Sequence, residues 1–332
     1  MDDVLKGYLD RLSGEGGDAL AVAAVIAALA RAAVELHAAI RNGVAPTGDG
    51  GRANASGEVQ KPLDLLADEL FLTALQSAPL HCYASEEQEQ PILMGGGSLA
   101  LAMDPLDGSS NIETNIAVGT IFSLLPVLPE HGGRPERIFA QAGHAQRAAG
   151  FFVYGAQLLL ILTCGAGTEC FVFDPTTGKY GRRTSCRIPA QACEYSINAA
   201  NRRHWPRPLQ RYLRGLELGG AGPRGRDFGM RYAGSLVADG YRILQRGGIF
   251  LYPADARDSH SSGRLRQLYE ANPIAFCIEQ AGGAASDGVG RMLDRPQGDL
   301  HGKVPLIFGS RDEVEIATRH LAQSAAVSTA AE

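Results

Sequence analysis

Short apolar runs typical of β-strands alternate with longer helix-like stretches along most of this chain. The strand-like runs cover residues 99–103, 117–126, 151–164, 169–173, 247–252 and 304–308. Helices are expected at about 19–40, 63–78, 201–215, 235–246 and 265–282, and again at the C-terminus. Such alternation favours a layered α/β architecture. The pattern changes character after Cys193. We therefore expect two domains, 1–190 and 191–332.

Local signals set the expected boundaries of several elements. Asp18 is expected to cap the first long helix, and the glycine-rich stretch 43–57 predicts a flexible loop. Asp104-Pro105 is expected to end the strand 99–103, because proline lacks the N–H that a strand needs. Asp174-Pro-Thr-Thr-Gly178 has the composition of a turn.

Composition excludes several classes of function. The 332 residues carry 31 Lys and Arg against 36 Asp and Glu, for a net charge of −5. A mildly acidic chain is a poor candidate for binding nucleic acid or a membrane surface. Any anionic ligand must therefore be held by local cations, backbone N–H groups or metal ions.

No segment is expected to cross a membrane or to direct secretion. Arg31 and Glu35 interrupt the apolar run that begins at Ala19, well short of the roughly 18–20 apolar residues that a span needs. The first residues are acidic, unlike the basic start of a secretory signal. The six cysteines are scattered, with no Cys-x-x-Cys pair, so we expect reduced thiols and a cytoplasmic protein.

The segment Asp104-Pro-Leu-Asp-Gly-Ser-Ser-Asn111 is the most informative for chemistry. It places two carboxylates, three residues apart, at the carboxyl end of an apolar strand. The turn also exposes the Leu106 carbonyl and the N–H groups of Gly108, Ser109 and Ser110. Mg²⁺ takes one or two carboxylates together with substrate phosphate, and free N–H groups can hold phosphate oxygens. The alternative is an ordinary turn, since Asp-Pro and Asp-Gly pairs are common in turns.

Two other places in the sequence support a metal site. Glu86 and Glu87 are adjacent and follow an apolar pair, and neighbouring carboxylates repel unless a cation or water separates them. Arg266 and Glu270 stand four residues apart on a predicted helix and share one face. The alternatives are a solvated acidic loop and a surface ion pair.

These residues amount to a family resemblance. Asp104-Pro-Leu-Asp-Gly-Ser-Ser resembles the metal motif of the magnesium-dependent, lithium-sensitive sugar and inositol phosphatases. Other segments stand in the order and spacing of class 1 fructose-1,6-bisphosphatase. They are Gly57-Glu-Val-Gln-Lys-Pro-Leu-Asp64, Ser85-Glu-Glu87, Asn198, Arg231-Tyr-Ala-Gly-Ser-Leu-Val-Ala-Asp239, Gly247-Gly-Ile-Phe-Leu-Tyr-Pro253 and Leu265-Arg-Gln-Leu-Tyr-Glu-Ala-Asn-Pro273. The resemblance implies a layered α-β-α-β-α sandwich of the sugar phosphatase type.

The resemblance also implies roles for individual residues. The metal ligands would be Glu86, Asp104, the Leu106 carbonyl, Asp107 and Glu270. They would hold two or more Mg²⁺ ions, with Mn²⁺ as a substitute. Glu87 and Asp64 match the acids that orient and deprotonate the attacking water. Arg266 would add to charge neutralisation.

Substrate contacts follow from the same resemblance. Asp107, Gly108, Ser109 and Ser110 would face the phosphate that is hydrolysed. The distal phosphate of a sugar bisphosphate would be held by Asn198, Tyr232, Tyr252 and Arg264. Arg231 would reach this pocket from a neighbouring subunit, so a homotetramer is expected. Core packing is the alternative for the tyrosines.

The sequence departs from the family pattern at several positions. Arg264 stands where many relatives have Lys, and Asn201 where some place a phosphate-binding Tyr. The residues with which vertebrate relatives bind AMP are replaced by Ser98, Leu99 and Pro126, so AMP inhibition is expected to be weak.

The expected activity is Mg²⁺-dependent hydrolysis of the 1-phosphate of fructose 1,6-bisphosphate. Arg264 and the Ala-Ser-Glu-Glu-Gln context also resemble the form associated with bacterial carbon fixation, which often hydrolyses sedoheptulose 1,7-bisphosphate. The remote alternatives are an inositol or nucleotide phosphatase and a non-catalytic metabolite-binding subunit.

Overall fold

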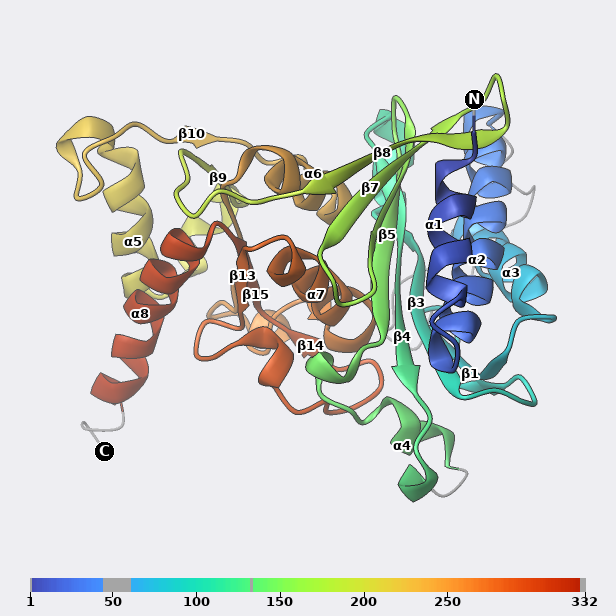
Figure 1. Ribbon diagram of the computed structural model, residues 1–332. Coiled ribbons are helices and arrows are strands. Elements are labelled where there is room, and N and C mark those ends of the chain that lie inside the picture. Colours follow the sequence, from blue (N-terminus) through green and yellow to red (C-terminus); the bar gives the residue numbers. More distant parts are fainter. Residues whose placement is uncertain (1, 44–60, 132–133, 329–332) are drawn as a thin grey trace.

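Alternating layers of helix and sheet build the molecule (Figure 1). The computed structural model describes residues 2–43, 61–131 and 134–328. The helices are α1 Val4–Ser13, α2 Asp18–Arg41, α3 Pro62–Leu75, α4 Pro135–Phe139, α5 Arg207–Glu217, α6 Leu236–Arg246, α7 Asn272–Gln280 and α8 Arg311–Ser328. Helices α1–α3 cover one face of a large sheet, α6 and α7 lie between it and a smaller sheet, and α5 and α8 cover the outer face. The expected α-β-α-β-α sandwich is confirmed.

The large sheet has eight strands in the order β2-β1-β3-β4-β5-β6-β7-β8. They are β1 Leu80–Ser85, β2 Ile92–Leu93, β3 Leu99–Asp107, β4 Val118–Pro126, β5 Ala148–Tyr154, β6 Leu158–Thr163, β7 Thr168–Asp174 and β8 Lys179–Cys186. Strands β1 and β3 are parallel, and every other neighbouring pair is antiparallel. Because β1 and β3 are parallel, their carboxyl ends lie side by side, and the residues that follow them are close in space.

The smaller sheet has five strands in the order β10-β9-β11-β15-β13, and β12 pairs separately with β14. These strands are β9 Glu194–Ser196, β10 Gly229–Met230, β11 Ile249–Tyr252, β12 Leu265–Arg266, β13 Ala284–Ser286, β14 Lys303–Val304 and β15 Leu306–Gly309. The side chains of α6 and α7 fill the space between the two sheets, so one apolar core joins them.

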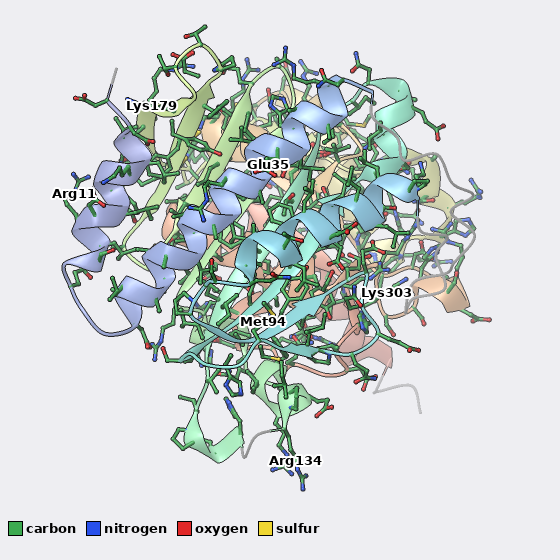
Figure 2. All side chains as sticks on the ribbon, turned by 90° about the vertical axis from the view of Figure 1, so that its right-hand side faces the viewer. Arg11, Glu35, Met94, Arg134, Lys179 and Lys303 are labelled. Atoms are coloured by element: carbon green, nitrogen blue, oxygen red, sulfur yellow. The ribbon has the colours of Figure 1, made fainter. Side chains whose placement is uncertain are left out.

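Helix α2 is the predicted helix 19–40, and it belongs to the core. Among the described residues, it is the one helix long and apolar enough to cross a membrane by length and composition alone. Ten of its side chains are buried, and it packs against α1, α3 and strands of the large sheet. Figure 2 shows α2, which carries Glu35, lying across that sheet beside α1 and α3. Its apolar character is therefore explained by packing.

The expected cap of α2 is wrong. Gly17 is the N-cap residue, and Asp18 is the first residue of the helix. The Asp18 carboxylate instead accepts a hydrogen bond of 2.6 Å from the Ser98 hydroxyl, just before β3. The loop predicted over residues 43–57 lies, apart from Gly43, outside the described residues, as do residues 57–60 of the first segment of the family resemblance.

The expected end of the strand at Asp104-Pro105 is also wrong, because β3 continues to Asp107. The pairing with β4 is irregular between Asp104 and Asp107, so Pro105 sits where a regular ladder is already broken. The Thr120 hydroxyl of β4 donates a 2.7 Å hydrogen bond to the Pro105 carbonyl. Both aspartates therefore belong to the sheet itself.

Prolines and short turns also divide several other predicted elements. The strand predicted over 151–164 is two strands, β5 and β6, separated by residues 155–157. Pro305 separates β14 from β15. The helix predicted over 201–215 is a 3₁₀ helix, Ala199–His204, followed by α5 after Pro206. The helix predicted over 265–282 begins as β12 and a turn of π-helix, Gln267–Ala271, before α7.

Gly119 of β4 provides a test of how closely β4 packs against β5 and α6. It stands opposite Asp107, and an added Cβ would lie 2.1 Å from the Phe152 carbonyl oxygen and 2.7 Å from a Val237 methyl carbon. We expect Gly119→Ala to lower the free energy of unfolding by about 1–3 kcal/mol or more, because the overpacked sheet must shift. Urea denaturation of the purified variant measures this change.

Gly290→Ala is the matched control, because Gly290 is exposed and an added Cβ there would meet nothing within 4 Å. Equal denaturation midpoints for the two variants would contradict the close packing at Gly119.

Candidate active site

Acidic side chains from two parallel strands meet at one edge of the large sheet. Ser85 of β1 pairs with Met103 of β3, so the residues that follow them stand side by side. The Glu86 N–H donates a 3.1 Å hydrogen bond to the Met103 carbonyl, which fixes the backbone of Glu86 next to Asp104. Glu86 and Asp104 are buried, and Glu87 is half-buried.

Three predicted metal ligands form one compact group. Asp104, Asp107 and Glu270 each offer a carboxylate oxygen, and these oxygens all lie within 4.8 Å of one another. The Val237 N–H at the start of α6 donates to Asp107 at 3.3 Å. The backbone N–H of Arg266 donates to Glu270 at 2.5 Å. The π-helical turn after β12 thus brings Glu270 next to Asp104 and Asp107, which are more than 150 residues away in sequence.

The electrostatics of this group favour a bound cation. Burial raises the pKa of Asp104 well above its usual range, and repulsion by Glu86, Asp107 and Glu270 raises it further. Burial also raises the pKa of Asp107 to about 7. The Arg266 guanidinium lies 2.9 Å from Glu86 and neutralises part of the charge. Four clustered carboxylates beside one arginine are a donor set that suits a hard divalent cation.

Asp64 lies in the first turn of α3, beside the turn that follows β3. Its Oδ2 accepts a 2.8 Å hydrogen bond from the Lys61 N–H, while its Oδ1 is buried with no hydrogen-bond partner among the described residues. Burial raises the pKa of Asp64, and the nearby Ser109 hydroxyl lowers it. Lys61 Nζ lies 3.5 Å from the Ser109 carbonyl. Asp64 therefore stands beside the candidate phosphate-binding turn.

That turn depends on Gly108, whose φ of 75° lies in the left-handed region. A 3₁₀ helix starts at Ser109, so the first N–H groups of this helix have no acceptor within it. The Asn111 side chain donates a 2.8 Å hydrogen bond to the Gly234 carbonyl and joins the turn to the segment before α6. The predicted residues Gly108, Ser109 and Ser110 thus lie next to the acidic group.

The predicted distal residues also come together. Arg264 lies over the ring of Tyr252, with its Cζ 5.9 Å from the ring centroid. Burial raises the pKa of Tyr232 to about 12, and this tyrosine lies near Tyr252, Arg264 and Asn198. Asn198, Tyr252 and Arg264 line one pocket beside β11.

Arg231 does not enter this pocket within its own chain. It is exposed, and its Nη1 donates to the adjacent Met230 carbonyl at 2.9 Å. Its backbone is held by the Tyr195 carbonyl of β9. A guanidinium displayed on the surface in this way is available to another subunit.

We call the pocket lined by Asn198, Tyr252 and Arg264 the distal pocket. Sequence reasoning missed Asp239 and two further residues that line this pocket. The buried Asp239 accepts hydrogen bonds from the Ser196 hydroxyl at 2.9 Å and from the Ala233 N–H at 3.1 Å. It therefore holds the segment that carries Tyr232, and its presence in the quoted Arg231–Asp239 motif was the available signal. Asp255 and Arg257 line the distal pocket, but nothing in the spacing of their loop pointed to it.

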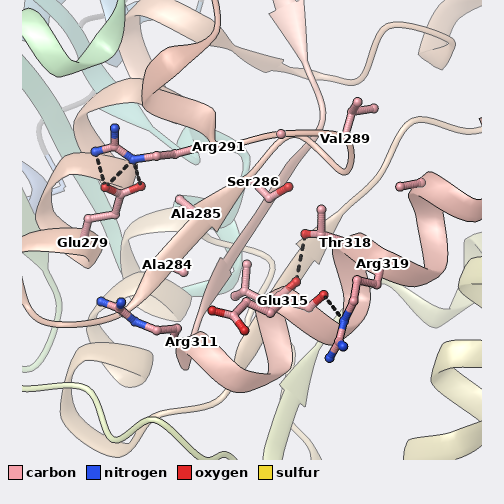
Figure 3. Close-up of a pocket in the computed structure, with 14 residues that line it drawn as sticks. Glu279, Ala284, Ala285, Ser286, Val289, Arg291, Arg311, Glu315, Thr318 and Arg319 are labelled. Carbon is pink, nitrogen blue, oxygen red and sulfur yellow. Dashed lines mark hydrogen bonds and ion pairs between the residues drawn. The ribbon is translucent and has the colours of Figure 1, made fainter.

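A separate groove lies between β13 and α8, away from the acidic group (Figure 3). Arg291, Arg311 and Arg319 lie around it, and Arg291 is paired with Glu279 at 2.6 Å. None of the predicted site residues lines this groove.

Two family models match the chain in succession. The model described as "Fructose-1-6-bisphosphatase, N-terminal domain" matches residues 10–184, and the one described as "Fructose-1-6-bisphosphatase, C-terminal domain" matches residues 188–322. Together they cover most of the chain, including every predicted site residue.

Individual relatives agree with these matches. The chain is 50% identical to the class 1 fructose-1,6-bisphosphatase of Rhizobium meliloti over 95% of this chain and 92% of the relative. It is 48% identical to that of Azorhizobium caulinodans over 93% of this chain and 96% of the relative. The crystal structure of Leishmania major fructose-1,6-bisphosphatase in holo form is 33% identical, with a TM-score of 0.83, and the match covers 90% of this chain and 94% of that one.

The raised pKa of Asp107 predicts that stabilisation of the fold by a divalent cation depends on pH. A carboxyl group whose pKa is near 7 when folded, against roughly 3.9 when unfolded, stabilises the fold in its protonated form, and this contribution is lost as pH rises from about 4 to about 7. A metal ion binds the deprotonated form. We therefore expect Mg²⁺ to raise Tm more at pH 8 than at pH 5.

Thermal unfolding at both pH values, with sodium chloride of equal ionic strength as the control, measures this difference. Asp107→Asn should reduce the Mg²⁺ effect at pH 8. An equal rise in Tm at the two pH values would contradict the coupled acidic group.

Proposed function

This chain belongs to the fructose-1,6-bisphosphatase family, a family of phosphatases, and we propose that its acidic group hydrolyses the 1-phosphate of fructose 1,6-bisphosphate with the help of Mg²⁺. The observation that carries the proposal is the cluster of Asp104, Asp107 and Glu270 beside a phosphate-binding turn. A small pocket on the same chain is lined by Asn198, Tyr252 and Arg264, whose side chains could bind a second phosphate.

The metal ligands in this proposal are Glu86, Asp104, the Leu106 carbonyl, Asp107 and Glu270. Their buried carboxylates repel one another, so a divalent cation fits the site chemically. When bound, Mg²⁺ would lower the pKa of a water and stabilise negative charge on the leaving oxygen. Hydrolysis of a phosphate monoester is slow enough uncatalysed that an enzyme must lower its barrier by more than about 20 kcal/mol.

Asp64 and Glu87 are proposed to orient and deprotonate the attacking water. The buried Oδ1 of Asp64 can accept a hydrogen bond from that water, and the raised pKa of Asp64 makes it a better base. Arg266 is proposed to stabilise charge on the transferring phosphoryl group, since it is buried beside Glu86.

The distal pocket supports a sugar bisphosphate as substrate. Asn198, Tyr232, Tyr252 and Arg264 offer an amide, two hydroxyls and a guanidinium at one place. An inositol phosphatase or a nucleotide phosphatase has no need for such a pocket. An acidic group that hydrolyses a 1-phosphate and a pocket that binds a second phosphate together favour fructose 1,6-bisphosphate as the substrate.

Other features of the proposal rest on the family relationship. We propose a homotetramer in which Arg231 reaches the distal pocket of a neighbouring subunit. A cytoplasmic location and a functional division near residue 190 belong to the same proposal. The two family models, which meet between residues 184 and 188, support that division.

Release of inorganic phosphate tests the activity. Wild-type protein should release phosphate from fructose 1,6-bisphosphate in Mg²⁺ and lose this activity in chelator, and Asp107→Asn should reduce kcat at least about 100-fold because a ligand to the metal is removed. Sedoheptulose 1,7-bisphosphate, assayed in parallel, distinguishes a dual enzyme from a fructose-specific one. Absence of Mg²⁺-dependent release from fructose 1,6-bisphosphate would contradict the proposal.

Arg231→Ala tests the shared pocket. Loss of a charge-assisted bond to the distal phosphate should raise KM about tenfold or more and change kcat much less. Steady-state kinetics separate the two effects. An unchanged KM would remove Arg231 from the site.

A further inference from the structure

The distal pocket contains a second arginine that the family resemblance did not indicate. The pocket lies between the 3₁₀ helix Ala199–His204 and the loop that follows β11. Arg257, on that loop, lines the pocket together with Arg264, Tyr252 and Asn201. The pocket thus has two guanidinium groups on the loop side.

Asp255 holds Arg257 in place. The Arg257 Nε donates to Asp255 Oδ1 at 2.9 Å, and Nη2 donates to Oδ2. The backbone N–H of Arg257 donates to Asp255 Oδ1 at 3.0 Å. The Asp255 side chain is only 5% exposed, and its pairing with Arg257 lowers its pKa to about 2. Because three donors converge on one carboxylate, the guanidinium is fixed before any ligand arrives.

The loop is itself attached to the opposite wall. The Ala256 N–H donates to the His204 carbonyl, at the end of the 3₁₀ helix, at 3.1 Å. Within the loop, the Asp255 N–H donates to the His260 carbonyl at 3.2 Å. The loop that carries Arg257 is therefore attached to the 3₁₀ helix that carries Asn201.

The charges around the pocket favour an anion with more than one negative charge. Asp255 is the one acid among the described residues that line it, and Arg257 already engages that acid. Arg264, His260 and Lys303 add positive or ionisable groups near Arg257, since Arg257, Arg264 and Lys303 each lower the pKa of His260. Asn201, which also lines the pocket, is a short neutral side chain and adds no negative charge.

We propose that Arg257 is a specificity-determining residue that binds the distal phosphate of the substrate, and that Asp255 is the positioning residue that aims it. Nε and Nη2 are engaged with Asp255, and among the described residues no group accepts a hydrogen bond from Nη1. A phosphate held between Arg257 and Arg264 receives donors from two planar groups. This inference rests on the proposed function, because it concerns the same pocket.

The test compares a substrate that carries the distal phosphate with one that lacks it. We expect Arg257→Ala to raise KM for fructose 1,6-bisphosphate at least about tenfold, with kcat changed less than about threefold. KM for fructose 1-phosphate should stay unchanged, because this substrate has no distal phosphate. Asp255→Asn should raise KM by a smaller factor, because it leaves the Arg257 guanidinium present but removes the carboxylate that holds its orientation.

Arg211→Ala is the matched control. Arg211 lies on the exposed face of α5, so this variant removes the same charge at the surface and should leave both KM values unchanged. Equal changes in KM for the two substrates in Arg257→Ala would assign Arg257 a structural role only. An unchanged KM for the bisphosphate would place Arg257 outside the phosphate contacts.

Binding of fructose 6-phosphate, measured by calorimetry, separates this inference from the proposed activity. Arg257→Ala should weaken that binding at least about tenfold whether or not the chain hydrolyses the bisphosphate. Wild-type binding without hydrolysis would contradict the proposed function alone. Equal affinity of wild type and Arg257→Ala would overturn the inference alone.

Discussion

Repulsion among buried carboxylates is the interaction on which this structure depends. Asp104, Asp107 and Glu270 place oxygens within 4.8 Å of one another in the interior, with Glu86 beside them and Arg266 as the nearby positive charge. Carboxylates in such surroundings either take up protons or bind a cation. The fold thus holds mutually repelling carboxylates close together, and a divalent cation bound there would reduce their repulsion. On the proposed function, catalysis and metal-dependent stability would have the same origin.

The rest of the fold keeps these carboxylates from moving apart. The parallel pair β1 and β3 fixes Glu86 against Met103, and the start of α6 holds Asp107 through the Val237 N–H. The close approach of Gly119 to Val237 lets α6 pack directly on β4. The segment of β12 and the π-helix carries both Arg266 and Glu270, so it supplies a proposed metal ligand together with a positive charge.

The sequence predicted the layers, the long helices and most of the acidic group, because apolar runs and carboxylates after a strand are local signals. It could not predict that β3 passes through Pro105, since that depends on an irregular pairing with β4. It missed the π-helical start before α7, where the position of Glu270 is set by tertiary packing rather than by helical periodicity. Arg257 was also missed, because its role follows from its pairing with Asp255 and from the attachment of its loop to His204.

Crystals soaked in Mn²⁺ would test whether the buried carboxylates bind a divalent cation, because anomalous scattering locates this ion independently of activity. We expect an anomalous peak in contact with carboxylate oxygens of Asp104, Asp107 and Glu270. Mn²⁺ favours oxygen ligands of the same kind as Mg²⁺ does. A peak only elsewhere, with no ion at these three carboxylates, would contradict the proposed metal site.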